Sequence, residues 1–248
     1  MSKLLPSMGD KLRVIIIGAS GGIGGALAEQ LLASPQVEKL YALSRQGAAF
    51  ASPKAVSLAF DFTDEDSVSA AAQTLRESGQ FDLIIVATGL LQGQGISPEK
   101  NMKAMNLKAF QASFAANTFG PAITAKHFLP LLRRGRKTVF SALSARVGSI
   151  SDNRLGGWYA YRASKAALNM ILKTLAIEYG RRFKDTIILG LHPGTVDTAL
   201  SKPFQGNVAE GKLFTPEFCA EKLLDVIDAA TPDYSGNLYD WAGKPIPF

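Results

Sequence analysis

The sequence is poor in the residues from which metal sites and disulfides are built. Of its 248 residues, one is cysteine and two are histidine. The lone Cys219 excludes an intramolecular disulfide and a cysteine-based metal site. His127 and His192 lie far apart in sequence, which makes a zinc site improbable. We therefore expect no metal.

Long apolar runs are also missing, although 47% of the residues are hydrophobic. The first apolar run, residues 14–17, is too short for a signal peptide, and nothing approaches the roughly 18 continuous apolar residues of a membrane span. The chain shows no repeats, low-complexity tracts or Pro/Gly/Ser-rich linkers. These absences predict a soluble, cytoplasmic protein with no membrane partner, folded as a single domain over residues 1–248.

Charge is only mildly unbalanced. The net charge of +6 could suggest a polyanionic partner. The strongest basic clusters, residues 133–137 and 181–184, each lie beside a glycine that ends a helical pattern. Basic side chains there complement the helix dipole and stay in solvent. We favour this interpretation and expect no nucleic-acid partner; an anionic dinucleotide would also suit the charge.

Short apolar segments alternate with helical patterns along the chain. Strands are predicted at 13–17, 39–43, 56–60, 81–88, 137–143 and 186–191, with an edge strand at 238–241. Helices are predicted at 24–32, 64–77, 98–132 (in one piece or more), 158–179 and 216–229. This order predicts an α/β fold, a three-layer α/β/α Rossmann-type arrangement with a doubly wound parallel sheet. Ligands of such sheets bind beyond the carboxyl ends of the strands.

A glycine-rich turn follows the first predicted strand and opens directly into a helix. Gly18, Gly22 and Gly24 allow a tight turn and a close approach to a pyrophosphate. The helix N-terminus supplies N–H donors and positive potential. We assign these glycines, with Ser20 and Ile23 of the same turn, to dinucleotide binding.

The residues after the next strands indicate which dinucleotide binds. A carboxylate at the end of the second strand would indicate NAD, but Ser44 and Arg45 stand there and suit a 2′-phosphate. The pattern therefore favours NADP(H). Asp61 either accepts a hydrogen bond from the adenine amino group or serves as a turn or N-cap residue, and the sequence leaves both open. Phe62 and Gly89 are assigned to the cofactor site as well.

Tyr161 and Lys165 are four residues apart in a predicted helix. That spacing places an ammonium group close to a phenol on one helix face. The pKa of a free tyrosine, near ~10, is too high for easy proton exchange at neutral pH, and a nearby cation lowers it. We therefore predict that Tyr161 is a catalytic acid and base. Lys165 is expected to lower the Tyr161 pKa and to hold the nicotinamide ribose.

With these motifs, the sequence resembles the short-chain dehydrogenase/reductase family over essentially its whole length. The spaced glycines of the turn and the tyrosine–lysine pair match the family's motifs. The resemblance implies that Asn117 holds a water for a proton relay. It also implies that the loop with Pro193 and Gly194 belongs to the cofactor site, with Val196 and Thr198 contacting the nicotinamide carboxamide. His192 is expected to pack or cap a strand end.

Segments 146–153, 156–162 and 236–248 resemble those of C-factor-like and sniffer-like carbonyl reductases. Two features depart from the family pattern. After the fourth strand, the usual Asn-Asn-Ala-Gly is Val-Ala-Thr-Gly at 86–89, so hydrogen bonds that steady the sheet must come from elsewhere. After the fifth strand, the serine that orients the substrate carbonyl is replaced by Ala145. We expect Ser144 to substitute if the loop shifts by one residue, with Ser141 a weaker candidate.

The resemblance predicts an NADP(H)-dependent oxidoreductase that moves a hydride between the nicotinamide and a small carbonyl or alcohol substrate. One alternative is an NADP(H)-binding signalling or sensor protein with little turnover, and another is an epimerase or dehydratase. Residues 199–214 are expected to form a lid over the substrate. Helical segments 104–132 and 159–179 suggest a homo-oligomer, either a dimer or a tetramer.

Overall fold

The centre of the protein is an eight-stranded sheet in the order β10-β9-β6-β5-β4-β1-β2-β3. The computed structural model describes residues 3–93 and 95–248. The strands are β1 Leu12–Ile17, β2 Val37–Ser44, β3 Ala55–Ala59, β4 Leu83–Val86, β5 Thr138–Leu143, β6 Thr186–His192, β9 Leu238–Asp240 and β10 Pro245–Ile246. All neighbours pair in parallel except β9 and β10. The predicted Rossmann-type sheet is confirmed, and β10 is an antiparallel edge that the pattern did not indicate.

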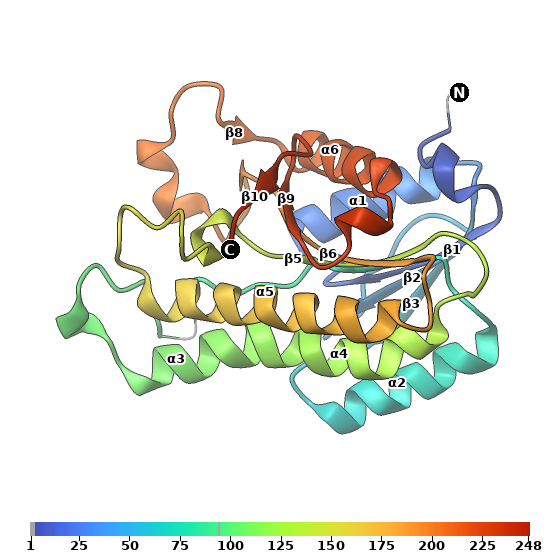
Figure 1. Cartoon of the computed structure of the whole chain (residues 1–248), viewed down its shortest axis with the longest axis horizontal. Helices are drawn as coiled ribbons and strands as arrows, with labels where there is room; N and C mark the ends of the chain where they lie inside the picture. Colours follow the sequence, from blue (N-terminus) through green and yellow to red (C-terminus); the bar gives the residue numbers. More distant parts are fainter. Residues whose placement is uncertain (1–2, 94) are drawn as a thin grey trace.

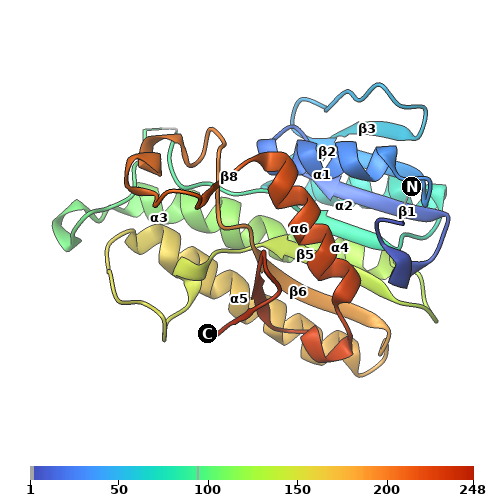
Figure 2. The same cartoon turned by 90° about the horizontal axis from the view of Figure 1, so that it is seen from above.

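Helices cover both faces of the sheet (Figure 1; Figure 2). Helices α1 Gly22–Ala33 and α6 Pro216–Ala229 lie on one face, and α2 Glu65–Ser78, α4 Gly120–Phe128 and α5 Tyr159–Gly180 lie on the other. Val14 and Ile16 of β1 enter the core under α1 and α6, whereas Ile15 and Ile17 enter the core under the other three helices. Strands with apolar side chains on both faces therefore sit between two helical layers. None of the helices within the described residues has the length and apolar content of a membrane span.

The predicted helix 98–132 was wrong at its start and is interrupted in its middle. A short 3-10 turn covers Met102–Ala104, and α3 begins only at Leu107 and runs to Phe114. Asn106 caps α3 because its side chain accepts a hydrogen bond from the backbone N–H of Ala109. A π-helical turn, Ala115–Phe119, then separates α3 from α4. A π-helical turn within a longer helical region often marks a functional site.

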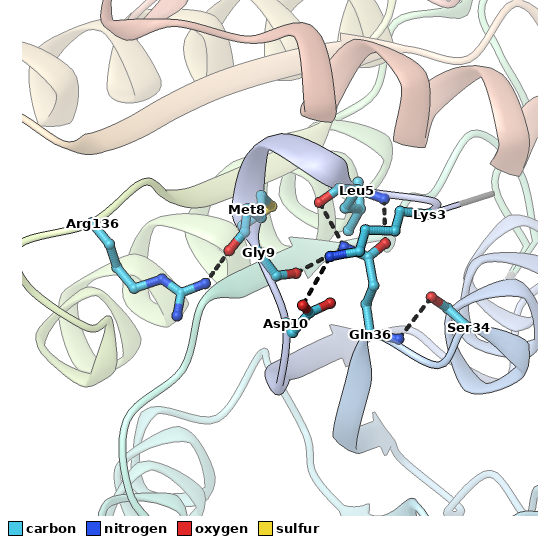
Figure 3. Close-up of polar contacts among 8 residues, drawn as sticks. All are labelled: Lys3, Leu5, Met8, Gly9, Asp10, Ser34, Gln36 and Arg136. Atoms are coloured by element: carbon cyan, nitrogen blue, oxygen red, sulfur yellow. Dashed lines mark hydrogen bonds and ion pairs between the residues drawn. The ribbon is translucent and has the colours of Figure 1, made fainter.

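The Gln36 side chain is one of the groups that hold the N-terminal segment, residues 3–10, against the body of the protein (Figure 3). Gln36 is 1% exposed. Its Oε1 accepts a hydrogen bond from Leu5 N at 2.9 Å, and its Nε2 donates to Leu5 O at 3.0 Å and to Gly9 O at 2.8 Å. Arg136 adds a hydrogen bond to the carbonyl oxygen of Met8. The segment is therefore an ordered part of the fold.

The basic cluster at 133–137 was expected to stay in solvent, but part of it contacts buried groups. The Nε atoms of Arg133 and Arg136 lie 3.3 and 3.6 Å from Oδ1 of Asp82, a fully buried carboxylate before β4. Lys137 donates to the carbonyl oxygen of Asp228 at 2.6 Å. A buried carboxylate is costly unless it is paired, so the two arginines serve the fold at this position.

Candidate active site

Two cavities lie beyond the carboxyl ends of the parallel strands. The Arg45 cavity, of about 230 Å³, is lined by Arg45, Asp61, Phe62, Thr63, Gly89 and Leu90, among others. The Tyr161 cavity, of about 220 Å³, is lined by Ser144, Tyr161, His192, Pro193, Val196 and Thr198, among others. Residues predicted for the site from distant parts of the chain thus gather at this edge of the sheet. Ile23 and Gly194 also line the Tyr161 cavity, whereas Ser20 is exposed in the glycine turn.

The glycine turn is so tight that a side chain at any of its three spaced glycines would meet neighbouring atoms. Gly18 has a φ of +85°, and a Cβ atom there would lie 2.9 Å from the carbonyl oxygen of Ala87. A Cβ at Gly24 would collide with the carbonyl oxygen of Gly18. Gly22 is the first residue of α1, two residues earlier than predicted, and a Cβ there would lie 2.7 Å from Cγ2 of Thr198. The turn therefore brings the N-terminus of α1 against β4 and against the loop after β6.

The Arg45 cavity combines a cation with hydroxyl and carboxylate groups. The hydroxyl that lines it belongs to Thr63. Ser44, which ends β2 just before Arg45, is buried outside the lining, and its Oγ has no hydrogen-bond partner among the described residues. Arg45 beside it is exposed. Oδ1 of Asp61 accepts hydrogen bonds from N and Oγ1 of Thr63, and these bonds, with a smaller attraction from Arg45, lower the Asp61 pKa. Asp61 thus occupies a turn, and Asp64, whose side chain accepts from Asp66 N, caps α2.

Phe62 is fixed at the same cavity by the start of α4. A Cβ atom at Gly120 would collide with the Phe62 ring and would lie 3.1 Å from the Phe62 carbonyl oxygen. Only glycine at position 120 therefore lets the Phe62 ring rest on the helix. The ring lines the cavity from the side of α4.

Tyr161 and Lys165 lie together on α5. Nζ of Lys165 is 5.9 Å from the centre of the Tyr161 ring and donates to the carbonyl oxygen of Leu143 at 2.6 Å. Lys165 is 2% exposed, and burial lowers its pKa to about 7. Burial raises the pKa of Tyr161 to about 12, which is opposite to the predicted direction. Removing a phenolate from water costs more here than the buried amine repays, so the neutral phenol is favoured.

Asn117 braces the loop that follows β4. Its Oδ1 accepts from Leu90 N and its Nδ2 donates to Leu90 O, both at 2.8 Å, and Nδ2 also donates to Ser164 Oγ at 3.0 Å. A Cβ atom at Gly89 would lie 3.8 Å from Oδ1 of Asn117 and 3.9 Å from Nζ of Lys165. Gly89 therefore faces the space between Asn117 and Lys165. These bonds supply an anchor for the loop in which the family's asparagines are missing.

Ser144 and Ala145 both line the Tyr161 cavity directly after β5. Ser144 is 3% exposed, and its hydroxyl donates to Oδ1 of Asn169 on α5 at 2.6 Å. Ser141, the weaker candidate, lies inside β5 and is fully buried. Of the two serines, Ser144 is the one that the structure brings to Tyr161.

The loop after β6 is held against aromatic side chains. Its strand β7, Thr195–Val196, pairs with β8, Leu213–Phe214. Gly194 has a φ of +78°, and a Cβ there would lie 2.7 Å from the Phe214 ring and 3.1 Å from Trp241. His192 was expected only to pack or cap a strand end, but its ring also lines the cavity. Burial, with the nearby Arg146 charge, lowers the His192 pKa to about 4, so the imidazole is neutral at pH 7.

Only part of the apolar wall of the Tyr161 cavity was predicted, namely the part that residues 199–214 contribute. This wall includes Leu91, Val147, Trp158, Leu200, Phe204 and Val208. The Trp158 ring lies 5.2 Å from that of Phe204 and 6.2 Å from that of Tyr161. The sequence signal for an unusual turn before Trp158 is the pair of glycines at 156 and 157. No Asp, Glu, Lys or Arg occurs among the described residues that line the cavity.

Residues 199–214, the expected lid, contribute part of that wall. The segment contains a 3-10 helix, Lys202–Asn207, and ends in β8. Leu200, Phe204 and Val208 line the cavity. Both views place this segment at the same end of the molecule as the start of α5 (Figure 1; Figure 2).

Comparison with known proteins agrees with this arrangement. The sequence profile of the short chain dehydrogenase family matches residues 12–208. The chain is 33% identical over 225 residues to 1-hydroxy-2-glutathionyl-2-methyl-3-butene dehydrogenase of Rhodococcus sp. (strain AD45), covering 90% of this chain and 93% of the relative. It is 34% identical over 136 residues to the C-signal protein of Myxococcus xanthus, covering 55% of this chain and 76% of the relative.

A solved structure is similar over almost the entire chain. The NADPH-bound carbonyl reductase from chicken fatty liver superimposes with a TM-score of 0.81 at 26% identity, covering 97% of this chain and 100% of that one. The predicted resemblance to C-factor-like proteins and carbonyl reductases is therefore confirmed.

Proposed function

The chain belongs to the short-chain dehydrogenase family, and from this premise we propose that it is an NADP(H)-dependent oxidoreductase acting on a small carbonyl or alcohol. The observation that carries the proposal is the placement of the Tyr161 phenol beside the Lys165 amine and in one cavity with Ser144. The chicken carbonyl reductase, whose structure contains NADPH, supports the choice of cofactor.

The residues at the strand ends fit NADP(H). The glycine turn admits a close approach of a pyrophosphate to the N-terminus of α1. At the Arg45 cavity, the Arg45 guanidinium suits a 2′-phosphate, and Asp61 and Phe62 would border the adenine. The buried hydroxyl of the preceding Ser44, which has no hydrogen-bond partner among the described residues, would add a contact to that phosphate. Gly89 leaves room beside Lys165 for the nicotinamide ribose. When bound, the cofactor supplies or accepts the hydride.

Tyr161 moves the proton. With a pKa of about 12, its phenol is protonated at neutral pH and can donate to a carbonyl oxygen. In reduction, a C–H bond forms at the carbonyl carbon, the C=O π bond breaks and the oxygen takes the Tyr161 proton. Ser144 positions that oxygen, and Lys165 holds the ribose. Asn117 keeps the loop after β4 in place.

The wall of the Tyr161 cavity selects the substrate. Its side chains are mostly apolar. Among the residues that the structure describes, no side chain lining this cavity carries a formal charge at neutral pH. A carboxylate or ammonium group would lose its hydration there without gaining a partner. We therefore expect an uncharged aldehyde or ketone, covered by residues 199–214 as a lid.

The function is tested with Tyr161→Phe and the neighbouring control Tyr159→Phe. Reduction of a panel of uncharged aldehydes and ketones is followed by NADPH absorbance. We expect Tyr161→Phe to lower kcat by ~10²-fold or more and to leave NADPH affinity, measured by calorimetry, unchanged. Tyr159→Phe should behave as the wild type. Full turnover by Tyr161→Phe would reject the assignment.

A sensor or signalling protein with little turnover is the second candidate. Two observations favour it: the similarity to a C-signal protein, and a Ser144 hydroxyl already bonded to Asn169. Tight NADPH binding without reduction of any carbonyl in the panel would support this candidate over the first.

The protein is also proposed to assemble with itself. Phe119 in the π-helical turn, and Met170 and Ile177 on α5, are 58%, 67% and 54% exposed. Burial of such apolar side chains between copies of these helices would stabilise a dimer or tetramer. Sedimentation equilibrium measures the oligomeric state directly.

A further inference from the structure

Helix α5 starts with backbone that leaves its first N–H groups without local acceptors. Gly156, Gly157 and Trp158 have φ values of +64°, +66° and +52°. Trp158 is the N-cap residue, and its side chain cannot accept a hydrogen bond from the helix. A left-handed φ is uncommon for a bulky residue and persists only where the surroundings hold it. The first turn of α5, which carries Tyr161, therefore depends on groups from elsewhere in the chain.

Glu99 provides the acceptors. Its backbone oxygen accepts from Trp158 N at 2.6 Å, and its Oε2 accepts from Ala160 N at 3.3 Å. The residue is 3% exposed, although its neighbour Lys100 lies in solvent. A carboxylate at this place also interacts favourably with the N-terminal end of the helix dipole. Glu99 thus replaces the side-chain cap that Trp158 lacks.

The segment around Glu99 also packs against the same turn. Ile96, Ala109 of α3 and Ala160 form a small buried cluster. A Cβ atom at Gly157 would lie 3.3 Å from the Glu99 backbone oxygen, so the chain passes close to Glu99 just before the helix begins. Both polar and apolar contacts therefore connect residues 96–99 to the residue that precedes Tyr161.

We propose that Glu99 is a positioning residue for Tyr161. Its two acceptor oxygens fix the first turn of α5, so the Tyr161 phenol and the Trp158 ring keep their places in the cavity wall. The effect on turnover rests on the proposed function, in which Tyr161 donates the proton. The effect on the helix turn does not depend on it. No other described side chain bonds the N–H of Ala160.

The main test compares Glu99→Ala with Glu99→Gln. Alanine removes the side-chain acceptor of the Ala160 N–H and keeps the backbone acceptor of the Trp158 N–H. Because a small displacement of the Tyr161 phenol lowers the rate steeply, we expect kcat to fall ~10-fold or more. Glutamine keeps an oxygen at the Oε2 position and should retain most of kcat. NADPH affinity should stay within about twofold of the wild type in both variants, since the glycine turn and the Arg45 cavity do not contact Glu99. Lys100→Ala is the matched control and should change neither quantity.

Hydrogen exchange gives a readout without any substrate. In Glu99→Ala the amides of residues 158–162 should exchange faster than in the wild type, whereas Glu99→Gln should preserve their protection. If Glu99→Ala does not fold, Glu99→Asp takes its place, because its shorter side chain keeps the charge but withdraws the oxygen from Ala160.

Three results would overturn the proposal. The first is an unchanged kcat in Glu99→Ala even with a lowered Tm, which would make the residue purely structural. The second is an equal loss of kcat in Glu99→Gln and Glu99→Ala, and the third is unchanged exchange in residues 158–162. If the wild type reduces no carbonyl at all, the proposed function fails, and the exchange comparison still decides the role of Glu99.

Discussion

Lys165 donates a hydrogen bond from its buried Nζ to the carbonyl oxygen of Leu143, at 2.6 Å. Leu143 is the last residue of β5 and directly precedes Ser144. The bond therefore joins the helix that carries Tyr161 to the strand that presents Ser144. The two polar groups proposed to meet the substrate oxygen are set relative to one another by this connection.

Substitution of that lysine should change how stability depends on pH. The Lys165 pKa falls from 10.5 to about 7 on folding, so the unfolded chain binds more protons than the native state between pH 7 and pH 10. Native stability therefore rises with pH over this window, by at most about 1.4 kcal/mol per pH unit. Lys165→Met should lose this rise. Urea unfolding at several pH values from 7 to 9.5 checks it, and parallel curves for the two proteins would contradict it.

Arg45 should decide between the two nicotinamide dinucleotides. Its exposed guanidinium has no ion pair among the described residues and is free to bind a phosphate. Charge-assisted hydrogen bonds contribute about 1.5–3 kcal/mol each, so Arg45→Ala should weaken NADPH binding by ~10- to 100-fold. NADH binding should be nearly unaffected. Calorimetric titration with both dinucleotides measures this, and an equal loss for both would refute a 2′-phosphate site.

Ser144 and Ala145 offer a paired test of substrate orientation. Ser144→Ala should lower kcat/KM by ~10-fold or more, since it removes a hydroxyl from the cavity. Ala145→Ser places a second hydroxyl in the cavity and should raise activity above the wild type. The double variant with the two residues exchanged should recover activity relative to Ser144→Ala. Steady-state kinetics on one uncharged ketone suffices, and an unaltered kcat/KM in Ser144→Ala would exclude its role.

Gln36 should contribute to stability far from the site. Gln36→Leu removes three hydrogen bonds to the backbone of residues 5 and 9, so we expect a loss of roughly 2 kcal/mol in the free energy of unfolding. Proteolysis should then cut first within the N-terminal segment. Gln46→Leu, at an exposed position, is the control. If residues 3–10 of Gln36→Leu resist protease as well as those of the wild type, other contacts are sufficient to hold the segment in place.

The parts of the fold with a strong periodic pattern could be predicted from the sequence. The strands that are apolar on both faces, the glycine turn and the spacing of Tyr161 and Lys165 all follow from local residue order. The start of α3 could not be predicted as reliably, because Asn101 and Asn106 each cap a separate helical piece within an apparently continuous pattern. Cap choice depends on which backbone N–H each side chain reaches in three dimensions.

The missed features of the site depend on tertiary burial. The Tyr161 pKa is raised because the phenol lies in a buried environment, which a helical spacing does not reveal. Glu99 is sixty residues before the helix that it caps, and Trp158 and Phe204 meet across two loops. Contacts of this kind carry no local signature.

The π-helical turn Ala115–Phe119 has a consequence for how this region can vary. Deletion of a single residue there would allow α3 and α4 to merge into one regular helix. Residues within the turn, Asn117 among them, would then change direction, whereas the flanking turns of α3 and α4 would keep theirs, because the π-helical turn accommodates the one extra residue locally. Asn117 would no longer face Leu90, and the loop after β4 would lose its anchor. The number of residues between 107 and 128 is therefore constrained more strictly than their identity. Natural variants should show substitutions in this segment but no deletions.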